Sequence, residues 1–497
     1  MTQLLFLDTR GIKKYVDERS YLYELRASSV NLASAMEETV KDLESQSQLK
    51  RIFVGGGNAL LSSDDTNVDL KTFDRAKIKA KFIEFLELPS DSIHPDLSIE
   101  FVDEKDRGNM LENLAIKKRE IHSQLRRKLP NSKDACTSCQ ERKGTVVVKY
   151  EEVDEDRRLC KPCASLREKG QRQYRNFLLS LIKEYNIELG IEKILKMQLE
   201  FIAGSNLEES DIEIHKARMA IVLVDGNLFG EFFSSIKDIS KLAEVSELID
   251  SEMKTIFDSE VKEITKTNQL DAVRLKLGKI YIGGDDMKLI LPGRVCIPFA
   301  YRLINAFSEW ANKKLSENLA LSVGISITKP KVKLNTAFDM GKYLLNQAKG
   351  IHKREYKGSI DFHLGLNTII PTTLHAYRRR EDVNNNYNAG VNVGDTFWNI
   401  MTKILPELEN YDILDIKYID AIKSNYLQPW RTINQRIVDN NGDIKEAILF
   451  CAYMFNRAEN SKRKTAKGYR SAMKLLTLSE YNYLLRAIEL VKVRCEL

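Results

Sequence analysis

The sequence predicts an α+β protein in which one unit of strand, helices and hairpin occurs twice. In each copy an apolar strand ends in an aspartate, and a hairpin with a glycine-rich tip follows after a helical stretch. The strands end at Asp8 and Asp225, and the tips are Gly55–Asn58 and Gly283–Asp286. An order of elements that repeats within one chain indicates an internal duplication.

Composition limits the possible classes of protein. The chain has 497 residues, of which 43% are hydrophobic and 30% charged, as expected of a globular protein with several domains. It contains no apolar run of about 18 residues, so we predict no membrane span. The N-terminus enters a strand directly without a basic segment, which favours a cytoplasmic protein over a secreted one. A net charge of +6 permits contact with nucleic acid but does not establish it.

The first copy is expected within residues 1–104. Its helical stretch carries Ser28 and Ser29, and a further helix and strand are predicted after the hairpin. The tip has no carboxylate, so it cannot hold a pair of metal ions. The backbone N–H groups of Gly56 and Gly57 could still cradle phosphates. We therefore expect the first copy to be non-catalytic.

Residues 105–204 are predicted to form a helical linker with a metal-binding module. Residues 105–130 read as a basic helix, which is either a solvated surface or a contact for nucleic acid or a partner. Two Cys-x2-Cys pairs follow, with 20 residues between them. This spacing is typical of structural zinc held by four thiolates, and disulfides are disfavoured in a reducing compartment. The four predicted ligands are Cys136, Cys139, Cys160 and Cys163.

The second copy, expected within residues 205–370, carries the chemistry. Adjacent carboxylates at a hairpin tip repel each other, and a divalent cation relieves that repulsion. A strand that ends in Asp, a helix and a hairpin with a Gly-Gly-Asp-Asp tip resemble the arrangement in which palm-type polymerases and nucleotide cyclases hold two metal ions. That resemblance implies that Asp225 and Asp285 bridge the ions, that the Gly226 carbonyl adds a ligand and that Asp286 supports the site. Two metal ions suit an in-line attack on a phosphate. The alternative is a solvated turn without a function.

The second copy continues with a helix over 298–318, a strand over 319–328, a helix over 336–349 and a strand from 359. Gly350 is interpreted as the stop of the last helix. Lys349 is therefore either a cation in the last turn of that helix or a ligand for nucleotide phosphates. Cys296 is expected to be a small core side chain.

Residues 371–497 are predicted to be a mostly helical domain. The stretch 462–470 is the most basic part of the chain, and it reads either as a flexible loop or as a contact for phosphates.

Several motifs occur in an order that resembles a known family. They are Leu-Asp-Thr-Arg-Gly-Ile, Arg-Ala-Ser-Ser, Gly-Gly-Gly-Asn, the cysteine pairs, Val-Asp-Gly-Asn-Leu-Phe-Gly, Tyr-Ile-Gly-Gly-Asp-Asp and Gln-Ala-Lys-Gly. Together they resemble the large polymerase/cyclase subunit of type III CRISPR effector complexes. The resemblance implies two ferredoxin-like, nucleotide cyclase-like palm domains, a zinc module between them and a C-terminal helical domain.

The resemblance also implies roles for individual residues. Asp225, Asp285 and Asp286 match the catalytic motif together with Gly226, Gly283 and Gly284. Ser28 and Ser29 match a segment that lines the nucleotide pocket, and Lys349 matches a lysine at a helix end. Many members begin with an HD nuclease domain that this chain lacks, so no DNase activity is expected. The family usually has Asp-x-Asp where this chain has Asn227.

The family implies an enzyme that converts ATP into cyclic oligoadenylates with two Mg²⁺ or Mn²⁺ ions when it senses RNA. Its expected partners are guide and target RNA, reached through other effector subunits, with the small subunit on the C-terminal helical domain. No membrane partner is expected. Two alternatives stay open: a standalone anti-phage cyclic-nucleotide synthase that no RNA guides, and a catalytically silent scaffold.

Overall fold

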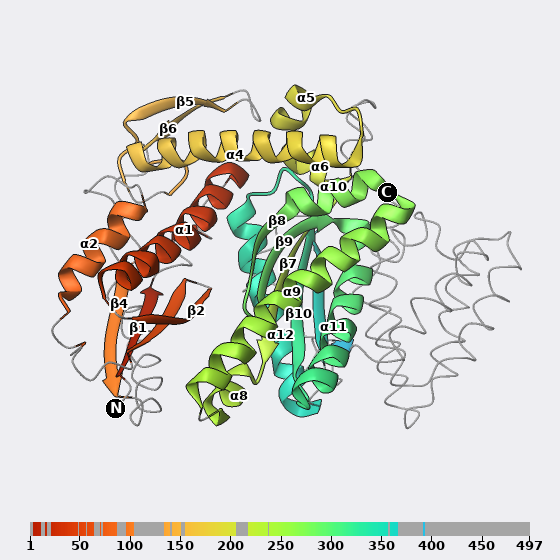
Figure 1. Cartoon of the computed structure of the whole chain (residues 1–497). Helices are drawn as coiled ribbons and strands as arrows, with labels where there is room; N and C mark the ends of the chain where they lie inside the picture. Colours follow the sequence, from red (N-terminus) through yellow and green to blue (C-terminus); the bar gives the residue numbers. More distant parts are fainter. Residues whose placement is uncertain are drawn as a thin grey trace, which may run out of the picture. The chain divides into compact units, whose positions relative to one another are not determined.

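The N-terminal copy folds as strand, helix, two strands, helix and strand in the computed structural model (Figure 1). Its four-stranded sheet has the order β2-β3-β1-β4, and β1 is antiparallel to both of its neighbours. This is the ferredoxin-like arrangement that the resemblance implied. The elements are β1 (Gln3–Arg10), α1 (Leu22–Gln46), β2 (Lys50–Gly55), β3 (Asn58–Ser63), α2 (Arg75–Phe85) and β4 (Asp96–Asp103).

The structure describes residues 3–10, 15–16, 21–47, 49–55, 57–63, 70, 73–86, 96–103, 134–139, 142–150, 155–204, 217–236, 238–355, 358–365 and 391–392. The predicted basic helix over 105–130 and the basic stretch 462–470 lie outside these residues. So does the predicted C-terminal helical domain, apart from β12 (Val391–Asn392). In the part of the chain that is described, no helix is long and apolar enough to cross a membrane.

The second copy repeats the same strand order. Its six-stranded sheet runs β12-β11-β10-β7-β9-β8, so a hairpin, a central strand and a closing strand follow one another as in the first sheet. The predicted duplication is therefore confirmed at the level of topology. The strands are β7 (Met219–Asn227), β8 (Lys279–Gly283), β9 (Asp286–Pro292), β10 (Ala320–Thr328) and β11 (Ser359–Gly365).

Helices connect these strands, and one of them corrects a predicted boundary. Helix α12 continues through Gly350, so the interpretation of that glycine as a helix stop is wrong. A Cβ atom on Gly350 would meet no atom within 4 Å, and its φ is not positive, so its backbone is ordinary helix. The helices are α8 (Phe229–Ser235), α9 (Ile239–Thr267), α10 (Gln269–Gly278), α11 (Gly293–Leu315) and α12 (Leu334–Glu355).

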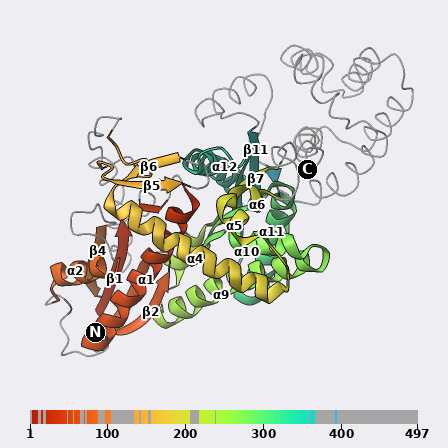
Figure 2. The same cartoon turned by 90° about the horizontal axis from the view of Figure 1, so that it is seen from above.

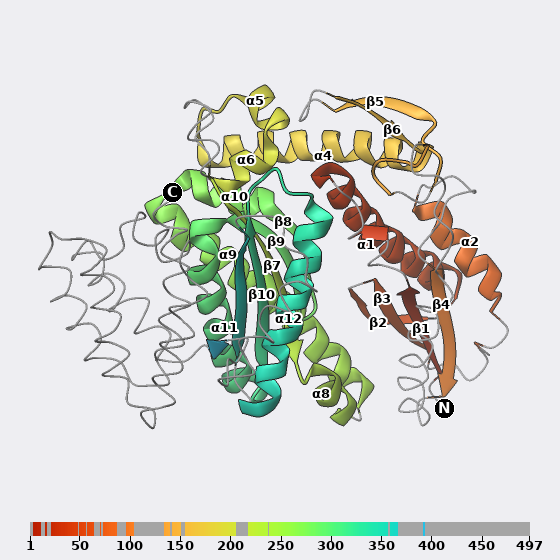
Figure 3. The same cartoon turned by 180° about the vertical axis from the view of Figure 1, so that it is seen from behind.

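By its internal contacts the chain divides into two units. The first comprises the described parts of 1–202, 223–291 and 331–338, and the second those of 203–222, 292–330 and 339–497. In the second unit, α12 lies directly on β10 (Figure 3), because Gly324 leaves room there for the backbone of Gly341 and Leu345.

Helix α1 organises the first unit. Its apolar positions recur every three or four residues, as in Leu32, Met36, Val40 and Leu43, and all four side chains are buried. The long helix α4 (Lys161–Tyr185) packs across α1, as seen from above in Figure 2. At the crossing Gly170 touches the backbone of α1, where a side chain would overlap the carbonyl oxygen of Tyr23.

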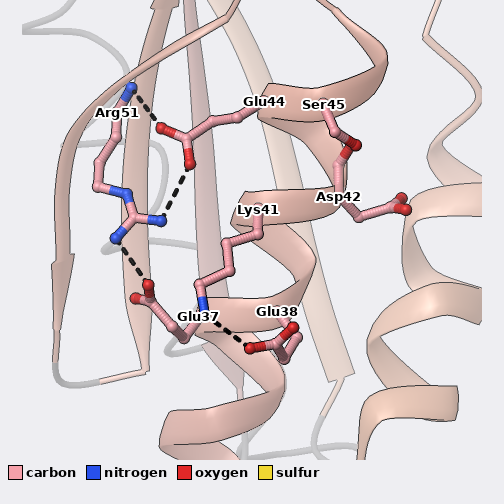
Figure 4. Close-up of polar contacts among 7 residues, drawn as sticks. All are labelled: Glu37, Glu38, Lys41, Asp42, Glu44, Ser45 and Arg51. Carbon is pink, nitrogen blue, oxygen red and sulfur yellow. Dashed lines mark hydrogen bonds and ion pairs between the residues drawn. The ribbon is translucent and has the colours of Figure 1, made fainter.

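The C-terminal half of α1 has a polar face that joins it to the neighbouring strand (Figure 4). The guanidinium of Arg51 on β2 contacts Glu37 at 2.7 Å and Glu44 at 3.0 Å. All three side chains are about one-third exposed. Partly exposed ion pairs of this kind contribute little stability each, so the bridge mainly fixes the register of β2 against α1.

Candidate functional site

The Gly-Gly-Asp-Asp segment forms the predicted hairpin. Gly283 pairs with Asp286, which leaves Gly284 and Asp285 as a two-residue turn between β8 and β9. Gly284 has a φ of +61°, whereas Asp285 has a negative φ. A positive φ at the first central residue only is the pattern of a type II′ turn, which takes glycine at that position. Because glycine must take the first central position of the turn, Asp285 takes the second position and Asp286 begins β9.

The turn brings Asp285 to the end of β7. A Cβ atom on Gly226 would lie 2.5 Å from Oδ2 of Asp285. The carboxylate therefore rests against the backbone beside Asp225, although Gly283 lies 58 positions after Asp225 in the sequence. Asp225 and Asp285 are half-buried, and Asp286 is exposed at the start of β9. Asn227, the position where the family usually has a second acid, is buried.

The surroundings of the hairpin include a residue that the sequence reasoning missed. The backbone N–H of Gly284 donates a hydrogen bond of 2.8 Å to Oδ1 of Asp250 on α9. Lys254, one turn further along α9, forms an ion pair with Oδ2 of the same carboxylate. Asp250 lies 34 residues before Gly284 in a helix that carries many charges, so no local pattern distinguished it.

The base of the hairpin contacts α1. Arg26 donates a hydrogen bond of 2.6 Å to the carbonyl oxygen of Leu277, and Ser29 donates one of 3.4 Å to that of Ile280. The Arg26 guanidinium lies 5.3 Å from the ring centroids of both Tyr174 and Phe177 on α4. Burial lowers the pKa of this arginine. The Arg-Ala-Ser-Ser segment therefore joins α1 to the end of α10 and to β8, the strand that leads into the acidic hairpin.

Other predicted site residues occupy different surroundings. Ser28 is buried, and its hydroxyl donates to the Leu25 carbonyl oxygen of its own helix at 2.9 Å. In the first hairpin, Gly57 has a φ of +80° and its carbonyl oxygen accepts the N–H of Thr9 at 2.9 Å. Gly56 lies outside the described residues. Lys349 is half-buried on α12, in the second unit.

By its place in the hairpin, Gly57 is the counterpart of Asp285. Gly55 pairs with Asn58 as Gly283 pairs with Asp286, so the second central residue is a glycine in one tip and an aspartate in the other. This supports the expectation that the first copy is non-catalytic.

The four cysteines of the predicted zinc site do come together. Their Sγ atoms all lie within 4.8 Å of one another, and those of Cys139 and Cys160 are 3.9 Å apart. A tetrahedral zinc ion with Zn–S bonds of about 2.3 Å places its sulfur ligands about 3.8 Å apart. The four thiols therefore lie close enough together to be the ligands of one zinc ion. Hydrogen bonds from the other three thiols hold the pKa of Cys136 far below its usual range.

The folding of the cysteine module follows from its local sequence. Thr137 donates its N–H to the Arg158 carbonyl oxygen at 2.9 Å, which holds the first cysteine pair beside β6. The module's two strands are β5 (Val146–Tyr150) and β6 (Glu155–Leu159), which pair antiparallel. Cys160 is the N-cap of α4 and Cys163 lies in the first turn of that helix, so the helix presents the second pair. Cys296, outside this group, is buried in α11 as predicted.

Comparison with known proteins identifies this architecture. Residues 218–357 match the family model described as Cas10/Cmr2, second palm domain. The solved structures with a similar fold include the apo Csm1–Csm4 cassette, with a TM-score of 0.56 and 15% identity over 99% of this chain and 70% of that one. The Csm1–Csm4 cassette in complex with one ATP has the same values, and the cassette in complex with cA4 has a TM-score of 0.53 with the same identity and coverage. No curated protein sequence matches the chain. At this identity the structural matches establish the fold.

Proposed function

Because the chain carries the second palm domain of the Cas10/Cmr2 family and has the fold of Csm1, we propose that it is a nucleotidyltransferase that makes cyclic oligoadenylates. It would use ATP and act within a type III CRISPR effector complex that senses target RNA. Similar folds have been solved with one ATP, with pppApApA and with cA4, which are a substrate, an intermediate and a product of this reaction.

One observation supports the chemistry above all others. The carboxylate of Asp285 rests against Gly226, the residue that follows Asp225, so the hairpin brings an acidic side chain to the strand that carries Asp225. Oxygen ligands of this kind suit Mg²⁺ or Mn²⁺. Asp225 and Asp285 would hold the two ions, with the Gly226 carbonyl as a further ligand and Asp286 in support. When bound, two such ions lower the pKa of the attacking hydroxyl and neutralise the leaving pyrophosphate.

The residues around this site would position the nucleotides. Ser29 lies at β8, and the glycines of the hairpin allow a ligand to approach the backbone closely. We assign nucleotide binding to the residues that match the family motif: Ser28, Ser29, Gly56, Gly57, Gly226, Gly283, Gly284 and Lys349. The cysteine cluster would hold a structural zinc ion, because four thiolates leave no open position for catalysis.

The test is a reconstituted reaction. The chain is incubated with its effector subunits, guide RNA, target RNA, Mg²⁺ and ATP, and cyclic products are measured by mass spectrometry. Replacing Asp285 and Asp286 with alanine is expected to abolish product. The control is Glu231→Ala, an exposed carboxylate on α8 that should leave the yield unchanged.

The same experiment separates the alternatives. Equal product from the Asp285→Ala/Asp286→Ala variant and the wild type would refute the assignment of the site. Product formed from nucleotides in the absence of any RNA would instead identify a standalone synthase. An assembled complex that turns over no nucleotide would indicate a scaffold.

A further inference from the structure

We propose that Asp250 is a positioning residue, which fixes the tip of the Gly-Gly-Asp-Asp hairpin from the neighbouring helix and so keeps Asp285 at the end of β7. The catalytic consequence rests on the proposed function. The contact itself, between Asp250 and the backbone of Gly284, does not depend on it.

The N–H of Gly284 needs an acceptor that the hairpin does not supply. The strand pairing ends with Gly283 and Asp286, so the N–H of Gly284 lies beyond the last pair. Asp250 accepts this N–H at 2.8 Å. A hydrogen bond to an ionised carboxylate is stronger than one between neutral groups. The tip of the hairpin is therefore held by a side chain that lies outside both of its strands.

The chemistry of Asp250 favours positioning over cation binding. Oδ1 accepts the N–H of Gly284, and Oδ2 pairs with Lys254. Both oxygens are thus engaged with donors of the protein, and the ammonium group of Lys254 balances the negative charge. Asp250 would therefore hold the backbone of the hairpin and not an ion.

Helix α9 is a firm support for this contact. Ile249 and Met253, on either side of Asp250 in the sequence, have exposed fractions of 1% and 0%. The Asp238 side chain caps the N-terminus of the helix by accepting the N–H groups of Ser240 and Lys241. With one face of α9 buried, the Asp250 side chain starts from a fixed backbone and is only 30% exposed.

Gly284 makes such a tether necessary. It is the residue that allows a positive φ at the turn, and nothing lies within 4 Å of the place where its Cβ would be. Glycine in open space has wide conformational freedom. Without the hydrogen bond to Asp250, the peptide that carries Asp285 would sample many orientations. Catalytic groups need positions fixed to about 0.5 Å, so loss of this hydrogen bond would lower kcat.

The experiment measures the contact and its consequence separately in the full chain. Hydrogen exchange of a peptide covering residues 279–292 reports the Gly284 N–H, and the reconstituted reaction reports kcat and KM for ATP. Asp250→Ala is expected to speed exchange at the tip by about ten- to hundredfold and to lower kcat by about tenfold with KM little changed. Asp250→Asn keeps the acceptor and should restore both to within about threefold of the wild type.

The control is Glu263→Ala, which removes an exposed carboxylate further along the same helix, paired with Lys266, and should change neither measurement. Exchange at the tip that is as slow in Asp250→Ala as in the wild type would overturn the proposal. So would an Asp250→Asn variant that behaves like Asp250→Ala, because charge and not the acceptor would then be what matters. If the chain produced no cyclic nucleotide at all, the exchange measurement would still decide whether Asp250 holds the hairpin.

Discussion

The contact between Gly226 and Asp285 makes a quantitative prediction for the substitution Gly226→Ala. The new Cβ would lie 2.5 Å from Oδ2 of Asp285, about 0.9 Å short of the 3.4 Å at which ordinary contact begins. It would also overlap the ring of Phe229, which is buried and cannot easily move away. The carboxylate or the hairpin must therefore shift by about 1 Å. A misplacement of that size in an active site costs about 10²-fold in rate.

The assay compares two alanine substitutions in the same segment. Gly230, four residues later, has nothing within 4 Å of its Cβ position and lies in α8. Gly230→Ala should therefore keep the wild-type rate and stabilise the helix by up to about 1 kcal/mol. Gly226→Ala should reduce the initial rate of cyclic product from ATP about a hundredfold, with a loss of about 1–3 kcal/mol in the free energy of unfolding.

Equal rates for Gly226→Ala and Gly230→Ala would refute the reasoning, because the overlap with Asp285 would then have no effect on catalysis. A double variant, Gly226→Ala with Phe229→Leu, identifies which neighbour transmits the strain. If the smaller side chain restored the rate, the obstacle would be the ring of Phe229 and not the carboxylate.

Two further predictions concern the structural parts of the chain. Gly170→Ala would place a Cβ against the carbonyl oxygen of Tyr23, and it should lower the free energy of unfolding, measured by urea titration, by about 2–3 kcal/mol. In the control Gly190→Ala, the new Cβ meets no atom closer than 3.9 Å, so the free energy of unfolding should change by less than about 0.5 kcal/mol. Native mass spectrometry should find one zinc ion per chain. The ion should be lost in Cys139→Ser and on acidification, because the cysteine thiols must be deprotonated to bind it. A metal-free wild-type chain at neutral pH would contradict the assignment.

Much of the fold could be predicted from the sequence, because local patterns specify it. The apolar run that ends in Asp225 predicted a buried strand, and it forms β7. The glycine and aspartate residues of the second hairpin determine a tight turn through backbone angles that act over four residues. The spacing of the two Cys-x2-Cys pairs predicted that the four thiols lie together, because a structural zinc site needs all four ligands.

A helix boundary was the place where a local pattern was misleading. Glycine after a cationic turn is a common helix end, but α12 packs along β10 and continues to Glu355. Burial of the helix face outweighs the small cost of a glycine within it.

The sequence by itself determined the two copies and the four thiols of the cysteine module. It also determined that one hairpin tip is acidic and that the other has no carboxylate. Only the tertiary structure decided what surrounds them. Asp250 accepts the N–H of the tip, Arg26 contacts the end of the helix before the hairpin, and Ser29 contacts the first strand of the hairpin. The physical reason is that turns and periodic strands depend on neighbours in the chain. Hydrogen bonds between residues 34 or 251 positions apart depend on how separate elements pack, and no short pattern encodes that.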